Sequence, residues 1–203
     1  MKKIIASQNA PNSSKSKKRE AKIFRVAANL IKEKGYHATS MNDIAKKLKL
    51  TKAGLYYYIK GKNELLLSII EFGMQNLHNQ VIDPCTCIKD PEERLREIIE
   101  RHTSLILELG GTISILTDEV QRLSPAQRIK IIDQKRDYLE LVRKTLRQLR
   151  AQKKMSSLNI DITAMNLFAV ILGVARWYKP KKEWSTKKIS REVSKFVMGT
   201  ILK

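Results

Sequence analysis

Residues 51–62, TKAGLYYYIKGK, combine three consecutive tyrosines with lysines on both sides. Phenol and ammonium groups donate hydrogen bonds to phosphate oxygens, and a lysine can also donate to guanine O6 and N7 in the major groove. Neighbouring residues of a helix point about 100° apart, so three successive rings cannot all enter one core. The segment therefore indicates a phosphate-contacting surface on which Lys52 reads a base. Tyr56 is the ring that we expect to lie partly in the core.

The net charge of +20 is concentrated in the N-terminal third of the chain. Residues 1–62 contain 16 Lys and Arg against 3 Asp and Glu, whereas residues 63–203 contain 24 against 17. A basic segment of this kind favours a polyanion, with nucleic acid as the first candidate. Two alternatives stay open at this stage: a basic surface that serves solubility alone, and non-specific DNA binding through charge.

The hydrophobic spacing predicts an all-α chain with about nine helices and no strand. We expect a flexible basic arm over residues 1–16, a three-helix DNA-binding domain over 17–62 and a helical ligand-binding and dimerisation domain over 63–203. A break is expected at Asp83-Pro84. The helices are expected at about 17–34, 41–48, from Thr51, from Lys62, and at about 91–108, 112–122, 125–153, 161–178 and 186–202.

Two short helices joined at Lys49-Leu50, after a longer first helix, are typical of a helix-turn-helix. The second short helix of this motif enters the major groove, where its first residues meet base edges. Here these residues begin with Thr51, Lys52 and Ala53. Lys62 opposes the dipole of the helix that it opens, by roughly 0.3–1 kcal/mol, and a bound phosphate would relieve that conflict.

Residues 39–66, TSMNDIAKKLKLTKAGLYYYIKGKNELL, resemble the DNA-binding domain of TetR-family transcriptional regulators. The turn and one aromatic position depart from the family pattern, with Lys49-Leu50 in place of Gly-Val and Ile59 in place of Phe, so the turn is expected to be strained or altered. The resemblance implies a double-stranded DNA operator as partner. It also implies phosphate contacts from Thr39 or Ser40, base contacts from Lys52 and Ala53, and backbone contacts from Tyr57, Tyr58 and Lys62, with Tyr56 in a mixed role. The matching residues are Thr39, Ile44, Ala45, Thr51, Leu55, Tyr56, Tyr58, Lys62 and Leu65 or Leu66.

The same resemblance implies a homodimer formed through the last two helices and a ligand held in the C-terminal core. Residues 117–138 and the WYKP of 177–180 loosely resemble a subgroup that regulates fatty-acid and steroid breakdown, several of whose members sense acyl-CoA thioesters. A long-chain acyl-CoA is therefore the first candidate for a small-molecule effector. A different apolar ligand, as in regulators of efflux or stress genes, is the alternative.

An acyl-CoA needs an apolar tunnel and a basic mouth for its phosphates. Each residue assigned to these has an ordinary alternative, because aliphatic residues commonly form core and basic residues are commonly solvated. The expected tunnel residues are Ile98, Leu105, Ile113, Leu116, Leu141 and Phe168. The expected mouth residues are Arg101, Arg176 and Lys179, with Trp177 beside them.

Several other classes of protein are disfavoured by the sequence. We find no nucleophile–base pair, no Gly-rich phosphate loop and no metal-ligand spacing, so an enzyme acting on CoA esters is not expected, nor is a cofactor. His102 beside Arg101 is attributed to surface charge. The longest apolar run, residues 167–175, is shorter than the roughly 20 residues of a membrane helix, and a cytoplasmic protein without a membrane partner is expected.

Overall fold

The computed structural model describes residues 14–178 and 184–203, and these fold into helices, without a strand in either range. One isolated bridge joins Met155 to Leu202. With η1 and α5 counted as the continuation of α4, the described ranges contain nine helical rods, which confirms the all-α expectation. The elements are α1 (Ser14–Lys34), α2 (Met41–Leu48), α3 (Lys52–Tyr56), α4 (Lys62–Leu77), the π-helix η1 (His78–Ile82), α5 (Asp83–Thr86), α6 (Pro91–Leu109), α7 (Gly111–Asp118), the 3₁₀ turn η2 (Val120–Arg122), α8 (Pro125–Ala151), α9 (Ile160–Trp177) and α10 (Thr186–Ile201).

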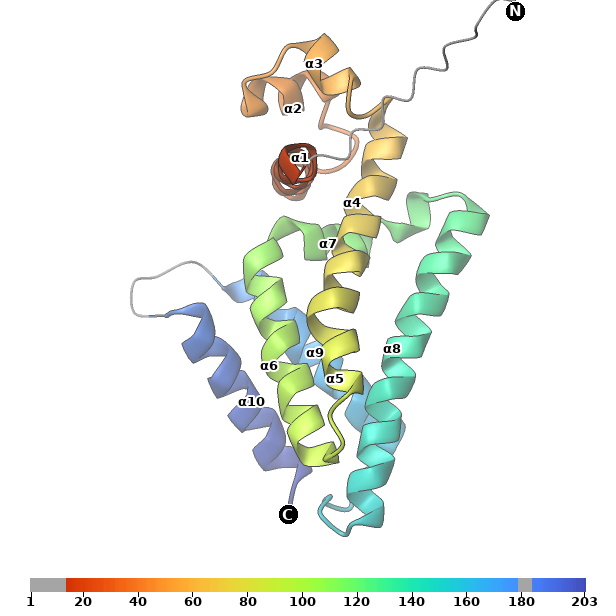
Figure 1. Ribbon diagram of the computed structural model, residues 1–203, viewed down its shortest axis with the longest axis vertical. Helices are drawn as coiled ribbons and strands as arrows, with labels where there is room; N and C mark the ends of the chain where they lie inside the picture. The colour runs from red at the N-terminus through yellow and green to blue at the C-terminus, as the bar shows by residue number, and fades with distance from the viewer. Residues whose placement is uncertain (1–13, 179–183) are drawn as a thin grey trace, which may run out of the picture.

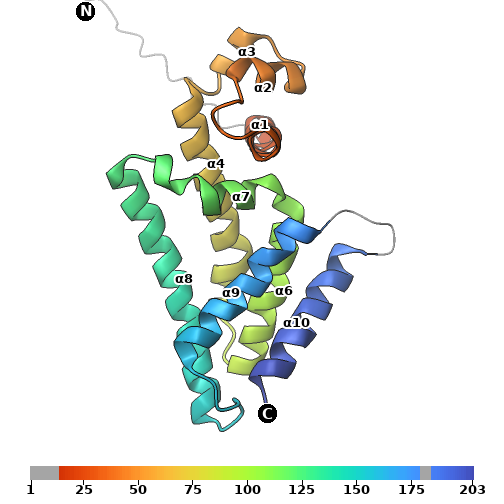
Figure 2. The same cartoon turned by 180° about the vertical axis from the view of Figure 1, so that it is seen from behind.

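Helices α1–α3, called the reader below, form one end of the molecule, and the C-terminus lies at the other (Figure 1). Helix α4 leaves the reader and runs down into a bundle with α6, α8, α9 and α10. The short helix α7 crosses the top of this bundle directly beneath α1, as the reverse view shows (Figure 2). Its position makes α7 the layer between the reader and the interior of the bundle.

Capping side chains set the helix starts where the sequence predicted them. Ser40 and Asp43 form a reciprocal capping box at α2, and Thr51 caps α3 by accepting from the Gly54 N–H at 3.0 Å. Asp90 and Ser124 cap α6 and α8, each with proline following in the first turn. Such caps satisfy backbone N–H groups that have no partner inside the helix.

Three boundaries differ from the expectation. The helix expected at 112–122 is divided into α7, which ends at Asp118, and the 3₁₀ turn η2. Helix α1 starts at Ser14, so the residues from 14 to 16 that we assigned to a basic arm are helical, and residues 1–13 lie outside the described range. The break predicted at Asp83-Pro84 is wrong, since the chain stays helical through η1 and α5. Pro84 lies where the π-helix η1 passes into α5, so the proline accompanies a change of helix type and not an end of the helix.

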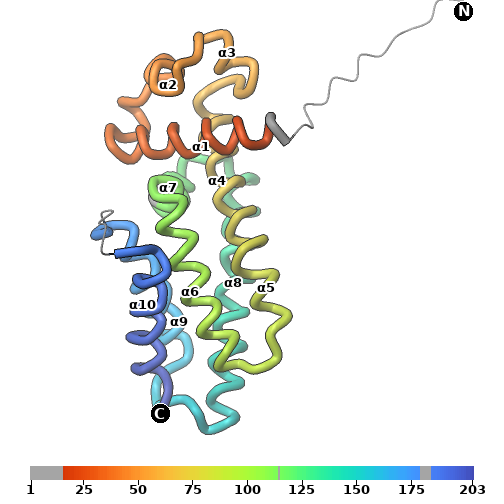
Figure 3. The backbone as a smooth tube through the Cα atoms, turned by 60° about the vertical axis from the view of Figure 1, so that its left-hand side comes forward, coloured from red at the N-terminus to blue at the C-terminus, as the bar shows by residue number. Residues whose placement is uncertain are grey.

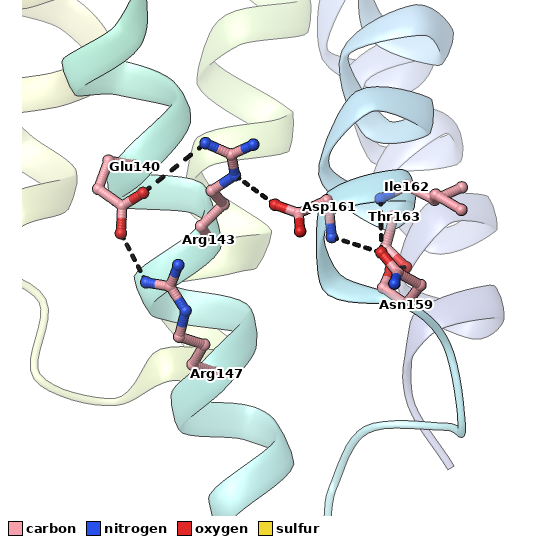
Figure 4. Close-up of polar contacts among 7 residues, drawn as sticks. All are labelled: Glu140, Arg143, Arg147, Asn159, Asp161, Ile162 and Thr163. Carbon is pink, nitrogen blue, oxygen red and sulfur yellow. Dashed lines mark hydrogen bonds and ion pairs between the residues drawn. The ribbon is translucent and has the colours of Figure 1, made fainter.

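The link from α8 to α9 is fixed by polar contacts near the start of α9 (Figure 4). The Asn159 side-chain oxygen accepts from the backbone N–H groups of Asp161 at 2.9 Å and Ile162 at 3.1 Å. Arg143 of α8 pairs with Asp161 through Nε at 2.8 Å and with Glu140 at 3.9 Å. These contacts hold the first turn of α9 against α8.

Helix α9 is apolar on two sides. One side carries the buried Leu167, Ile171 and Val174, while Ile162 on the other side is 62% exposed. By length and composition alone, this helix passes as a membrane span, with a mean hydropathy of 1.5 and only 28% of its window buried. The expectation that no segment resembles a membrane span is therefore not met by this helix. The exposed apolar side of α9 needs an explanation.

Candidate functional site

The reader exposes the first turn of α3 at the outermost end of the molecule (Figure 3). Leu55 and Ile59 are buried beneath it, as their spacing predicted. Lys52 and Ala53 are exposed, and the Thr51 cap orders the turn that carries them. This arrangement presents one ammonium and a small side chain where a groove could approach the backbone.

The three tyrosines differ in burial. Tyr57 is 77% exposed and Tyr56 is 39% exposed, whereas Tyr58 is half-buried against the core. The prediction that Tyr56 is the ring partly in the core is therefore wrong, and Tyr58 has that position. Helix α3 ends at Tyr56, so the turn that follows directs Tyr58 inward, where its ring meets the Tyr57 ring edge-on at 5.1 Å.

A second assignment, the phosphate contact by Thr39 at the start of α2, is wrong. Thr39 is buried, and its hydroxyl donates to the carbonyls of Gly35 at 2.9 Å and Leu30 at 3.4 Å, so it joins α1 to α2 rather than facing a phosphate. Ser40 is exposed, but its hydroxyl donates to Asp43 Oδ2 at 2.6 Å. These hydrogen bonds from Ser40 hold the pKa of the Asp43 carboxyl below its usual value. A phosphate contact by Ser40 thus competes with the capping box.

The helix-turn-helix turn is strained, as the missing glycine suggested. Lys49 adopts the left-handed conformation, with φ 54° and ψ 42°. Its N–H donates to the Lys46 carbonyl, and the Leu50 N–H donates to the Ala45 carbonyl at 2.9 Å, which closes the end of α2. A side chain with a Cβ in this region costs roughly 1–2 kcal/mol relative to right-handed backbone.

Lys62 lies at the junction between the reader and the bundle. Its ammonium donates to the His37 carbonyl at 3.2 Å and lies 4.4 Å from the centre of the Tyr36 ring. Burial lowers the pKa of Lys62. The ammonium is thus already engaged within the protein, and a phosphate would have to share it.

Two contacts at this junction join segments far apart in the chain. Arg122 Nη1 lies 2.7 Å from His37 Nε2, and its guanidinium stacks over Tyr36 at 5.2 Å. The Gly111 N–H at the start of α7 donates to Asn29 Oδ1 of α1 at 3.0 Å. Sequence reasoning missed both, because no local pattern links residues more than 80 positions apart.

A cavity of about 220 Å³ lies under α7, between α4, α6, α8 and α9. Four of the six expected tunnel residues line it, namely Leu105, Ile113, Leu116 and Phe168, whereas Ile98 and Leu141 do not. Leu77, Leu139, Met165 and Leu172 extend this apolar wall. None of these four was assigned to the tunnel from the sequence, nor were the other lining residues, which are Gly73, Met74, His102, Thr117, Lys135 and Tyr138.

A polar pair interrupts the apolar wall. His102 is buried, and its Nδ1 lies 3.2 Å from the Tyr138 hydroxyl, with the Phe168 ring edge-on to both. Burial lowers the pKa of His102 to about 4, so its imidazole is neutral at pH 7. The attribution of His102 to surface charge is therefore wrong, since its helical neighbour Arg101 faces out while His102 faces in.

The expected mouth residues are not brought together. Arg176 lines a second hollow of about 290 Å³ that shares the wall residues Ile113, Thr117 and Leu172 with the cavity. Arg101 pairs with Glu97 at 2.6 Å in a groove between α6 and α10 and does not line the cavity. Trp177 is exposed, with its ring edge-on to that of Trp184, and Lys179 lies outside the described residues. Among the described residues, no cluster of His, Cys, Asp or Glu could hold a metal ion.

Comparison with known proteins gives two family matches. Residues 23–69 match the model described as bacterial regulatory proteins, tetR family, and residues 89–201 match a tetracyclin repressor-like C-terminal domain. The chain is 21% identical over 190 residues to the transcriptional repressor KstR2 of Mycobacterium tuberculosis, covering 91% of this chain and 94% of that one. It is also 21% identical over 181 residues to the fatty acid metabolism regulator protein of Bacillus subtilis, covering 88% and 93%. Among solved structures, AibR in complex with isovaleryl coenzyme A and operator DNA superposes with a TM-score of 0.77 at 27% identity, covering 91% and 98%.

Proposed function

Because the chain belongs to the TetR family of bacterial transcriptional regulators, we propose that it represses its target genes until a small apolar effector fills the cavity under α7. Regulators of this family are DNA-binding proteins and not enzymes. The observation that carries the proposal is the placement of α7. This helix forms the roof of the cavity through Ile113 and Leu116 and contacts the reader through Gly111.

On the reader, we propose that Lys52 and Ala53 contact base edges and that Tyr57 and Tyr56 donate to phosphates. The exposure of these four residues on the outermost surface supports this assignment. Tyr58, which is half-buried, and Lys62, the first residue of α4, are proposed as further phosphate contacts. We propose that the DNA-binding domain, which contains the reader, extends to residue 62 and begins with α1 at Ser14, and that the sensor comprises 63–203, with α4 passing from one to the other.

We further propose a homodimer formed by α9 and α10. A single reader contacts too few base pairs for strong specificity, whereas a two-fold dimer reads a palindrome. Exposed apolar side chains support this face as the interface, including Ile162 of α9 at 62% and Phe196 of α10 at 66%. A second copy packed here would also cover the outer side of α9, so that its membrane-like composition needs no bilayer and the protein would work in the cytoplasm.

For the effector, we propose an acyl-CoA thioester. The apolar cavity suits an acyl group, and AibR, which resembles this chain over most of its length, was solved with isovaleryl coenzyme A. The volume of about 220 Å³ argues against the long chain first expected. Since a cavity of about 150 Å³ holds benzene, this one suits roughly six to nine carbon atoms. We propose Arg176, which lines the adjoining hollow, as the residue that meets the CoA phosphates.

The test is fluorescence anisotropy on DNA from upstream of the protein's own gene. A repressor should prefer its site to random DNA by about 10³-fold or more at physiological salt, whereas a non-specific basic protein would not. Lys52→Ala should cost about 1–3 kcal/mol and relax specificity, and Tyr57→Phe should weaken all sites alike. Lys144→Ala, which removes one exposed charge from α8, away from the reader and from the proposed interface, is the control for electrostatics alone.

The effector is tested by adding hexanoyl-CoA to the DNA complex. Release of the DNA would support the acyl-CoA assignment, with a coupling free energy of about 1–3 kcal/mol. Binding to DNA that hexanoyl-CoA leaves unchanged would keep the repressor and reject this effector. The same assay with apolar compounds that lack CoA would then test the alternative, a regulator that senses a different apolar ligand.

A further inference from the structure

Lys135 is an unexpected residue in the wall of the cavity. It comes from α8, is half-buried, and lines the cavity beside Leu116, Leu139 and Tyr138. Its ammonium donates to the Leu116 carbonyl at 2.7 Å. Within the described ranges, no carboxylate lies within ion-pair distance of it. A charged group in an apolar wall without an opposite charge is costly unless its hydrogen bonds are made.

The contact with Leu116 has a structural role that explains part of this arrangement. Leu116 lies in the last turn of α7, whose final carbonyls have no partner within the helix. A lysine near a helix C-terminus satisfies such carbonyls and interacts favourably with the dipole. A capping lysine could do this from solvent, however, and here it does so at the surface of an apolar cavity.

Lys135 has N–H donors for which the described structure shows no acceptor, and its side chain lines the cavity. An ammonium has three N–H donors, and the described structure supplies one acceptor, the Leu116 carbonyl. Burial lowers the pKa of Lys135, which is consistent with an incompletely solvated ammonium. The other polar groups of the wall already have partners: His102 Nδ1 and the Tyr138 hydroxyl lie 3.2 Å apart, and the Thr117 hydroxyl donates to the Ile113 carbonyl at 3.3 Å. Lys135 is therefore the donor best placed to receive an oxygen of an incoming ligand.

We infer that Lys135 selects ligands that carry an acyl oxygen, by donating to that oxygen while it holds the Leu116 carbonyl. The inference rests on the proposed function and names the chemical group that the cavity recognises. The acceptor is the carbonyl of a thioester or the carboxylate of the free acid, and a purely apolar molecule of the same size lacks it. Because the same ammonium holds α7, an oxygen bound there acts directly on the helix that contacts the reader.

The experiment compares two CoA derivatives that differ only in this oxygen. Hexanoyl-CoA carries the carbonyl and S-hexyl-CoA, a thioether, does not. Calorimetric titration into the full-length protein should show that the wild type binds the thioester about 10- to 100-fold more tightly, as expected for a hydrogen bond to a charged group. In Lys135→Met the two compounds should bind within about twofold of each other. Lys144→Met, an exposed position on the same helix, should keep the wild-type preference.

The outcomes test two proposals, the role of Lys135 and the acyl-CoA effector. Equal binding of both compounds to the wild type, or a preference that survives in Lys135→Met, overturns the role of Lys135 and leaves the acyl-CoA effector standing. If hexanoate binds the wild type as tightly as hexanoyl-CoA does, and binds Lys135→Met more weakly, the role of Lys135 is supported and the ligand is a free carboxylate. If the wild type binds none of the three compounds, the proposed effector and this inference both fail. Unchanged operator binding and thermal unfolding of Lys135→Met show that the variant is folded.

Discussion

The contact between α1 and α7 leads to a quantitative prediction at Gly111. A Cβ added at this residue would lie 2.5 Å from Asn29 Oδ1, 2.9 Å from Asn29 Cα and 3.0 Å from the Ala28 carbonyl carbon. An ordinary contact begins at 3.4 Å, so 3.4 minus 2.9 requires about 0.5 Å of retreat by the backbone of α1. Ala28 is fully buried, and α1 therefore cannot move without disturbing the reader core.

The expected cost of Gly111→Ala combines three effects. Overpacking of a buried contact costs about 1–3 kcal/mol. Loss of the Gly111–Asn29 hydrogen bond adds about 0.5–1.5 kcal/mol, and the reduced freedom of the unfolded chain offsets about 0.4–1 kcal/mol. The net expectation is a decrease of about 2 kcal/mol in the free energy of unfolding. With an m-value of about 2 kcal/mol/M, the urea midpoint falls by about 1 M.

The assay is urea unfolding followed by circular dichroism, at fixed protein concentration because a dimer is expected. Asn29→Ala serves as the comparison, since it removes the hydrogen bond without the clash and should cost only about 0.5–1.5 kcal/mol. The double variant should remain destabilised, because the Asn29 Cα stays in the way. Gly111→Ala with wild-type stability would refute the close approach of α1 and α7 and, with it, the role of α7 as the link to the reader.

Three further changes have definite expected outcomes. Because burial lowers the pKa of His102 from 6.5 to about 4, the folded state binds fewer protons than the unfolded state, and stability present above pH 6.5 is lost as the pH falls toward 4. The free energy of unfolding should therefore be about 2 kcal/mol lower at pH 5 than at pH 7, and His102→Gln should largely abolish this difference. A His102→Gln variant that keeps the wild-type pH dependence would contradict the argument. Gly73→Ala places a Cβ closer than 3.0 Å to Leu116 Cδ1, which should push the Leu116 side chain into the cavity. Calorimetric titration should then show effector binding weakened by roughly tenfold. Wild-type affinity would show that the cavity is not the binding site. Lys49→Gly should raise the melting temperature by about 2–4 °C by removing the left-handed strain, and a lower value would mean that the Lys49 side chain stabilises the turn.

Local signals in the sequence were sufficient for most of the reader. Ser40 and Thr51 are side chains whose capping function depends on the next three residues, so α2 and α3 could be placed without knowing any distant contact. The same holds for Asp90 before Pro91. The failures in this region concern burial. Thr39 and Tyr58 turn inward because of where α1 and α4 pack, and a sequence pattern does not contain that information.

The cavity was predictable only in part for the same reason. Leu105, Ile113, Leu116 and Phe168 were identifiable as apolar residues of amphipathic helices, and the cavity lies where those faces meet. His102 and Lys135 gave no such signal, since a polar residue on a helix rich in charged residues is ordinarily solvated. Their burial depends on the crossing of α6, α7 and α8, which brings residues 19 to 36 positions apart into contact.

Helix α7 also bears on how the ligand preference of such a protein can diverge. Its two turns meet α1 on one side and the cavity on the other, so a substitution that reshapes the cavity from α7 also disturbs the reader. Residues such as Leu139 and Met165 line the cavity from α8 and α9, which do not share that constraint. We therefore expect new specificities to arise more readily on α8 and α9. A mutational scan for altered effectors should recover variants there, whereas variants in α7 should more often lose regulation altogether.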